Sequence, residues 1–266
     1  MICDILSGVI ANILFAVLTV GVVYLLYYFF RRKPLFGFFG LTETREVSIY
    51  LSHLQIQQGG AIGADGLPRS FGGSAVPYLE ALCSSSVASL FRVSMPGRSI
   101  QPSWLSSILL ADVSLSLVPA PLPPDQVTFP STTIVVGSPA YSTASAAIQN
   151  DLQSPVHFNA LNSQIIVPGL PPVTNPRQAF IVRLPHQTHF VFYLGGLSEG
   201  GTAAALSYLA RSWRALHRRY RQVPAFYILV EFVGQDYTNS HIVAEGQLNV
   251  AKRKGLMRPE PASIHG

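Results

Sequence analysis

The sequence predicts a three-layer α/β domain with a mostly parallel sheet, placed behind a single N-terminal transmembrane helix. Two observations predict the domain. Patterns typical of buried strands alternate with helical patterns, and a turn rich in glycine or serine follows three of the strands. A third observation, the absence of charge from residues 5–30, predicts the membrane helix. The 266 residues are enough for one sizeable domain and this appendage.

Composition narrows the classes of partner. Apolar residues make up 48% of the chain and charged residues only 12%, a balance that favours membrane contact. The net charge of +5 suits an anionic membrane surface or a phosphorylated ligand, and it also leaves nucleic acid open. Cys3 and Cys83 form no disulfide framework, and the scattered His53, His186 and His189 lack metal-ligand spacing. We therefore expect a reducing compartment, no metal and no cofactor.

Residues 1–33 are expected to form a permanent anchor. The segment Arg31-Arg32-Lys33 closes the apolar run, so the positive-inside rule places the N-terminus outside the cell and the following domain in the cytoplasm. A cleaved signal peptide is the competing interpretation, and Asp4 in place of a basic n-region argues against it. Small residues in the run could pair helices and so produce a homo-oligomer. Residues 34–44 are predicted to be a linker.

The first turn of interest follows a strand predicted at residues 47–52. The glycine-rich segment 57–66 is predicted to be a functional loop, with Gly59, Gly60 and Asp65 as candidate ligand-binding residues. A helix is expected to begin at Gly72 and to continue to about Phe91, with Pro77 in its first turn.

The second turn lies between a buried strand at residues 132–136 and a helix that continues to about Leu152. Gly137, Ser138 and Ser142 are its candidate ligand-binding residues, because hydroxyl groups at a helix N-terminus suit a phosphate or a ribose. The alternative is that the serines only cap the helix. A further strand is predicted at residues 111–119.

The third turn is the most pronounced and follows a strand that begins at His189. Its candidate ligand-binding residues are Gly195, Gly196, Gly200, Gly201 and Thr202, with Thr202 as the predicted helix cap. The helix that follows has one apolar stripe, which consists of Leu206, Leu209, Trp213, Leu216 and Tyr220.

Shorter strands are predicted at residues 164–167 and 179–184, as a hairpin before the central strand, and a last strand at residues 226–232. The whole domain is expected to occupy residues 45–245, and residues 246–266 are expected to form a loosely ordered tail. If the three strands are parallel in one sheet, their turns share one edge, where open α/β sheets bind ligands.

Two resemblances bear on function. Ile49-Tyr50-Leu51-Ser52 with its glycine-rich loop resembles the opening of nucleoside deoxyribosyltransferases and, more loosely, of TIR domains. The segment from Leu194 to Thr202 resembles the glycine-rich turn of the SLOG and lysine-decarboxylase-like nucleotide-binding proteins. These resemblances imply a Rossmann-like domain and a nucleotide-type ligand.

The resemblances also imply a glutamate on the helix after the turn, but here that helix begins Ala203-Ala204-Ala205. Glu199 and Glu80 are the alternative catalytic carboxylates, each of which could instead be an ordinary solvated residue. We therefore expect a membrane-anchored sensor or effector that binds a nucleotide-like small molecule. The alternatives are a nucleoside- or NAD-processing enzyme and a tethered scaffold without a ligand.

Five arginines lie along or just after the last long helix. A solvated face is one interpretation, membrane lipid headgroups are another, and nucleic acid ranks behind both because no exposed aromatic residues alternate with the arginines. These residues are Arg211, Arg214, Arg218, Arg219 and Arg221.

Overall fold

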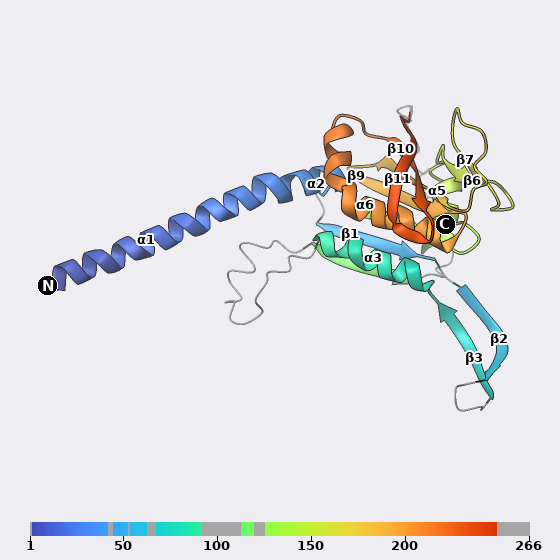
Figure 1. The fold of residues 1–266 in the computed structure, drawn as a ribbon, viewed down its shortest axis with the longest axis horizontal. Coiled ribbons are helices and arrows are strands. Elements are labelled where there is room, and N and C mark those ends of the chain that lie inside the picture. Colours follow the sequence, from blue (N-terminus) through green and yellow to red (C-terminus); the bar gives the residue numbers. More distant parts are fainter. Residues whose placement is uncertain are drawn as a thin grey trace, which may run out of the picture.

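The computed structural model shows a long helix that leads into a mixed α/β domain (Figure 1). It describes residues 2–41, 45–52, 54–62, 68–91, 113–119 and 126–248. The helices are α1 (Ile2–Tyr27), a π-helical turn (Tyr28–Arg32), α2 (Lys33–Phe39), α3 (Tyr78–Phe91), α5 (Thr143–Asn150) and α6 (Glu199–Arg219).

Seven strands form the central sheet, in the order β11-β10-β8-β9-β5-β1-β4. Their bounds are β1 Glu46–Leu51, β4 Ser114–Pro119, β5 Thr132–Val136, β8 Gln178–His186, β9 His189–Gly196, β10 Phe226–Val233 and β11 Asp236–Gln247. The strands β4, β1, β5 and β9 are parallel neighbours, whereas β8 runs antiparallel between β9 and β10, and β11 is antiparallel to β10. The sheet is therefore mostly parallel, as predicted, and the three strands that precede the glycine-rich turns run in the same direction.

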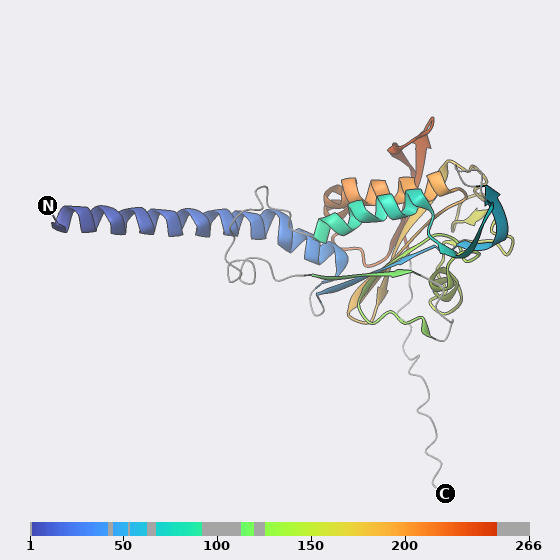
Figure 2. The same ribbon diagram turned by 90° about the horizontal axis from the view of Figure 1, so that it is seen from below.

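Apolar clusters lie on both faces of this sheet. Because successive side chains of a strand point to opposite faces, Ile134 and Val136 belong to one cluster and Val135 to the other. The first cluster contains side chains of α2, α3 and α6, and the second contains those of α5 and of the segment from Val156 to Val173. Figure 2 shows α3 and α6 together on one side of the sheet.

The predicted apolar stripe of α6 is confirmed, because all five of its side chains are buried in the first cluster. The helix begins differently from the prediction. Ser198 is the N-cap and its hydroxyl accepts a hydrogen bond from the N–H of Gly201 at 3.0 Å, whereas Thr202 lies within the first turn.

The long N-terminal helix joins the domain through the π-helical turn and α2. By length and composition the helical stretch Gly8–Phe39 can cross a membrane, because an 18-residue window in it has a mean hydropathy of 2.5, and a signal sequence would meet the same criteria. Residues 34–44, predicted to be a linker, contain most of α2, and this helix buries Leu35, Phe38 and Phe39 in the domain. The spacing of these apolar residues already suits a helical stripe, and Gly40 ends the helix in a left-handed conformation with φ 75°.

A buried arginine holds α2 against the rest of the domain. The guanidinium of Arg183, on β8, donates to the carbonyl oxygens of Phe38, Tyr220 and Val223. It also lies over the rings of Phe38, Phe190 and Phe226 at 4.5–5.4 Å. The carbonyls of Phe38 and Tyr220 belong to the C-terminal ends of α2 and α6, where the helix dipole is negative, so they favour the buried positive charge.

The region after β1 differs most from the prediction. Residues 57–62 of the segment predicted to be a loop lie in β2 (Leu54–Ile62), which pairs with β3 (Pro68–Ala75) in a separate two-stranded sheet, and residues 63–66 lie outside the described residues. The helix predicted from Gly72 begins only at Tyr78, because Pro77 holds the preceding residue in an extended conformation. In Figure 1 this hairpin extends outward beyond the carboxyl end of β1.

Three further differences concern short or polar segments. Strands β6 (His157–Phe158) and β7 (Ile165–Ile166) form a small sheet of their own, while β8 pairs with β9. The strand β11 was not predicted, because its sequence is polar and lacks an apolar alternation. It continues to Gln247, so the first residues of the predicted tail are ordered, and residues 249–266 lie outside the described part.

Candidate functional site

The site lies at the carboxyl ends of β1, β5 and β9. The middle strand of the three, β5, leads into α5 on one face of the sheet, whereas β1 and β9 lead into α3 and α6 on the other face. Neighbouring parallel strands whose connections leave toward opposite faces create a topological switch point, where open α/β sheets hold their ligands. The strand order therefore identifies this edge without reference to any motif. In Figure 1 it faces away from the anchor.

Ser52, Glu80 and Gly137 meet at this edge. The backbone N–H of Ser52 donates to Oε2 of Glu80 at 3.3 Å, and Oγ of Ser52 donates to the carbonyl oxygen of Val136 at 3.4 Å. Gly137 has φ 93°, and a Cβ at this position would lie 1.8 Å from Oγ of Ser52 and 3.7 Å from Oε1 of Glu80. Only glycine fits here, both for conformation and for space, so the backbone of the turn stays bare beside the carboxyl group.

Glu80 is the buried acid of the site. Only 4% of its surface is exposed. Burial raises the pKa of Glu80 to about 7, the hydrogen bonds from Ser52 oppose this effect, and the nearby charge of Glu199 adds to it. Near neutral pH the carboxyl group is therefore present in both forms, and can accept or donate a proton.

Glu199 has a defined structural contact. Its side chain is exposed, and its Oε1 accepts a hydrogen bond from the backbone N–H of Leu79 at 2.8 Å. It therefore caps the first turn of α3 from the first turn of α6 and links the two helices. Glu80 is the better placed of the two alternative carboxylates, because it is buried beside the bare backbone at Gly137, whereas Glu199 is exposed.

The start of α5 lies on the opposite face of the same edge. Ser142 is the N-cap of α5, and its Oγ accepts from the N–H of Ser145 at 3.2 Å. Oγ of Ser145 donates to the carbonyl oxygen of Gly137 at 2.9 Å, which fixes the turn against the helix. Ser138 is also buried. Ser142 therefore caps α5, and the backbone of Gly137 lies close to Glu80.

The third glycine-rich turn is tightly packed against its own helix. The N–H of Gly196 donates to Oγ1 of Thr202 at 3.1 Å, and a Cβ at Gly196 would lie 2.6 Å from the backbone nitrogen of Thr202. A Cβ at Gly201 would lie 3.2 Å from two carbonyl oxygens, those of Pro176 and Gln178. These glycines therefore allow close packing between β9 and α6.

The other two glycines of this turn are also in contact with neighbouring side chains. A Cβ at Gly195 would lie 2.9 Å from the ring of Phe158, and one at Gly200 would lie 3.3 Å from the ring of Phe232. The contact with Phe158 explains why glycine is needed at Gly195. Because aromatic side chains cover the backbone at Gly195 and Gly200, a ligand has less access to it than to the backbone at Gly137.

The first predicted turn lies apart from the other two. Gly59 and Gly60 pair with Phe71 and Ser70 in the β2–β3 hairpin, next to a register shift. Asp65 lies outside the described residues. Ser52 was not among the candidate site residues, although it ends the segment Ile49-Tyr50-Leu51-Ser52 that carries one of the resemblances. The feature of the sequence that could have identified it is its position at the end of a predicted strand.

No group of three or more His, Cys, Asp or Glu side chains within the described ranges could hold a metal ion. Comparisons of this chain with models of known protein families, with curated proteins and with solved structures gave no match.

Proposed function

We propose that this chain is a membrane-anchored sensor or effector whose domain binds a nucleotide-type small molecule at the carboxyl edge of β1 and β5. One observation supports the proposal most strongly: Ser52, Glu80 and the bare backbone at Gly137 meet at a topological switch point. A carboxyl group with a pKa of about 7 can accept a hydrogen bond from a ribose hydroxyl, or donate one to a ring nitrogen.

The anchor gives the proposal its cellular setting. Arg31-Arg32-Lys33 at the end of the apolar run favours an N-terminus outside the cell and a cytoplasmic domain. Small residues in the run, including Gly8 and Ala11, could let anchors associate, so that a ligand would act on a homo-oligomer. A Rossmann-like, three-layer arrangement is part of the same proposal, supported by the switch point and by the apolar clusters on both faces.

A second candidate is an enzyme that cleaves the N-glycosidic bond of a nucleoside or of NAD. The position of Glu80 favours it, because a buried carboxyl with a raised pKa is suited to protonate a leaving base or to deprotonate an attacking water. Glu199 has its cap contact with Leu79 and is not required for this role. The two candidates share one site and differ only in turnover.

The test uses the full chain in detergent micelles, with nucleosides, nucleotides and NAD added one at a time. A binding nucleotide raises the unfolding temperature, because it stabilises only the folded state. Glu80→Gln is expected to weaken that binding about three- to tenfold, which is the usual effect of one changed hydrogen bond. Glu199→Gln is the matched control and should stay within about threefold, because the amide oxygen can still cap α3.

Chromatography of the same mixtures separates the two candidates. Binding with no free base released supports the sensor, and release of base that is lost in Glu80→Gln supports the enzyme. If no nucleoside, nucleotide or NAD shifts the unfolding temperature of the native chain, a nucleotide-type ligand is ruled out.

A further inference from the structure

The C-terminal part of α6 carries three exposed arginines. Arg214 and Arg218 are four positions apart and so lie on the same side of the helix, and Arg221 follows just after its end. No ion pair joins any of the three to a carboxylate in the described part of the chain. We call Arg214, Arg218 and Arg221 the basic face.

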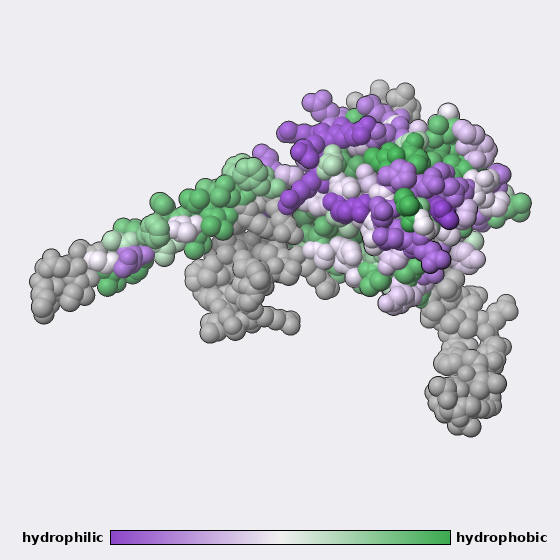
Figure 3. Space-filling model, viewed as in Figure 1, coloured by the Kyte–Doolittle hydropathy of each residue, from purple (hydrophilic) through white to green (hydrophobic). Residues whose placement is uncertain are grey.

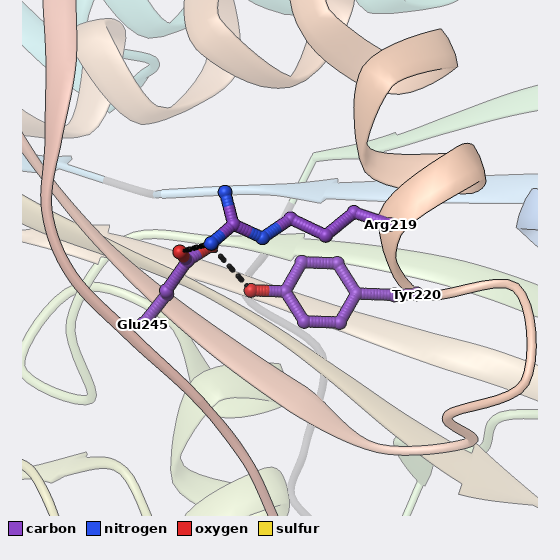
Figure 4. Close-up of polar contacts among 3 residues, drawn as sticks. All are labelled: Arg219, Tyr220 and Glu245. Carbon is purple, nitrogen blue, oxygen red and sulfur yellow. Dashed lines mark hydrogen bonds and ion pairs between the residues drawn. The ribbon is translucent and has the colours of Figure 1, made fainter.

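The two other arginines of this helix are used within the domain. Arg211 donates to the carbonyl oxygens of Thr238 and Ser240 on β11. Arg219 forms an ion pair with Glu245, which also accepts a hydrogen bond from the hydroxyl of Tyr220 at 2.5 Å (Figure 4). The structure thus divides the five arginines into two that hold β11 in place and three that are exposed and form no ion pair within the described residues. Of these three, Arg214 lies over the ring of Trp213 at 5.3 Å.

The basic face lies beside the point where the anchor enters the domain. The ring of His217, between Arg214 and Arg221 in sequence, is 6.3 Å from the ring of Phe38 on α2, measured between centroids. The positive charges of Arg221 and Arg183 help burial to lower the pKa of His217, so Arg221 is also close to this contact. Figure 3 shows hydrophilic side chains gathered at this end of the domain, next to the apolar helix.

The distance to the membrane surface follows from the length of α2. This helix has 7 residues. At 1.5 Å per residue it rises only about 10 Å from Lys33, the last residue of the basic segment that closes the apolar run. The Debye length at physiological ionic strength is about 8 Å, so charges at this height are partly screened from the membrane surface, and their attraction to it is strongest at low salt.

We propose that the basic face binds anionic lipid headgroups of the leaflet from which the anchor emerges. The inference requires that α1 crosses a membrane, but it does not depend on the ligand site, which lies at the opposite end of α6. Nucleic acid fits less well, because Trp213 and Tyr220, the aromatic residues of this segment, are buried and offer no base a stacking surface.

The test places a probe on the basic face of the full chain. Cys3 and Cys83 are replaced by serine and alanine, and Ala215, which is exposed and adjacent to Arg214, is replaced by cysteine and labelled with a fluorophore. The protein is inserted into nanodiscs that contain a headgroup nitroxide quencher, either with zwitterionic lipid alone or with about a third of anionic phosphatidylglycerol. A label at Leu161, which is 83% exposed and lies between β6 and β7, reports non-specific quenching, because Figure 1 shows these two strands on the side of the domain away from α1.

We expect the equilibrium constant for docking, measured at Ala215, to rise about fivefold for each arginine in anionic discs at low salt, and to fall back in 1 M salt. The triple change of the basic face to glutamine should abolish the rise, and the triple change to lysine should retain it. Arg177→Gln, which removes an exposed charge near the other end of α6, is the matched control and should have no effect.

Equal quenching in both kinds of disc would overturn the inference, as would a rise that persists in the glutamine variant. A single-stranded oligonucleotide added to zwitterionic discs provides the remaining arm. If it binds and the glutamine variant loses that binding, the basic face belongs to nucleic acid and the inference is wrong. Thermal shifts with nucleotides on the same glutamine variant show separately whether the ligand site is intact.

Discussion

Replacing Glu80 by glutamine should make the domain more stable at neutral pH. Burial raises the pKa of Glu80 from its ordinary 4.5 to about 7, so the folded state holds this proton more tightly than the unfolded state. Below pH 4.5 the carboxyl group is protonated in both states and does not lower the free energy of unfolding. Between pH 4.5 and about pH 7 the folded state loses stability, because only the unfolded state releases the proton readily. At 1.36 kcal/mol per pKa unit the full penalty is about 3 kcal/mol. Glutamine cannot ionise and avoids it.

The assay is urea unfolding of the full chain in detergent, followed by tryptophan fluorescence between pH 4.5 and pH 8. Burial lowers the pKa of His186, His189 and His217, which makes stability rise with pH over part of the same range. Both proteins share this contribution, so the difference in unfolding free energy between Glu80→Gln and the native chain isolates the carboxyl. Glu199→Gln controls for the loss of an exposed carboxylate. A difference that does not grow between pH 4.5 and pH 7 would refute the reasoning.

Two further substitutions and one protease experiment test the rest of the structure. Gly137→Ala should lower the unfolding free energy by at least about 3 kcal/mol in the same urea assay, and adding Ser52→Gly should restore part of it by removing the hydroxyl that the new Cβ would meet. Arg183→Met should cost about 3 kcal/mol or more by the same measurement, because three buried carbonyl oxygens lose a charged donor, and a cost below 1 kcal/mol would contradict this role. Protease added to intact cells should leave the domain whole, and its digestion would show that the orientation of the anchor is reversed.

The core elements could be predicted because burial leaves a direct mark on the sequence. The strand β5 is buried on both faces and is apolar at three consecutive positions, Ile134, Val135 and Val136. The helix α6 shows its apolar stripe because its outer side is solvated. Where hardly any side chain is buried, as in the polar edge strand β11, the sequence has no such mark, and the strand is found only from its pairing with β10.

The centre of the site could not be predicted, because it depends on the order of strands in the sheet. Ser52 is 28 positions from Glu80 and 84 from Val136, yet it contacts both. Periodicity shows that a strand is buried but not which strand lies beside it. The third glycine-rich turn shows the opposite situation. Its motif was evident in the sequence, but in the structure Gly196 and Gly201 allow α6 to pack closely against β9.

Two helices connect the candidate site with α2. Both α3 and α6 begin at the edge of the candidate site, where Glu199 of α6 caps α3, and both contact α2 near their C-terminal ends. The ring of Phe91, the last residue of α3, is 4.9 Å from that of Phe39, and the ring of His217 near the end of α6 is 6.3 Å from that of Phe38. The 21 residues of α6 span about 31 Å. Packed helices transmit a shift at one end as a rigid body. A ligand that moves the first turns of α3 and α6 would therefore also move α2, which Arg183 fixes to the sheet and to the end of α6.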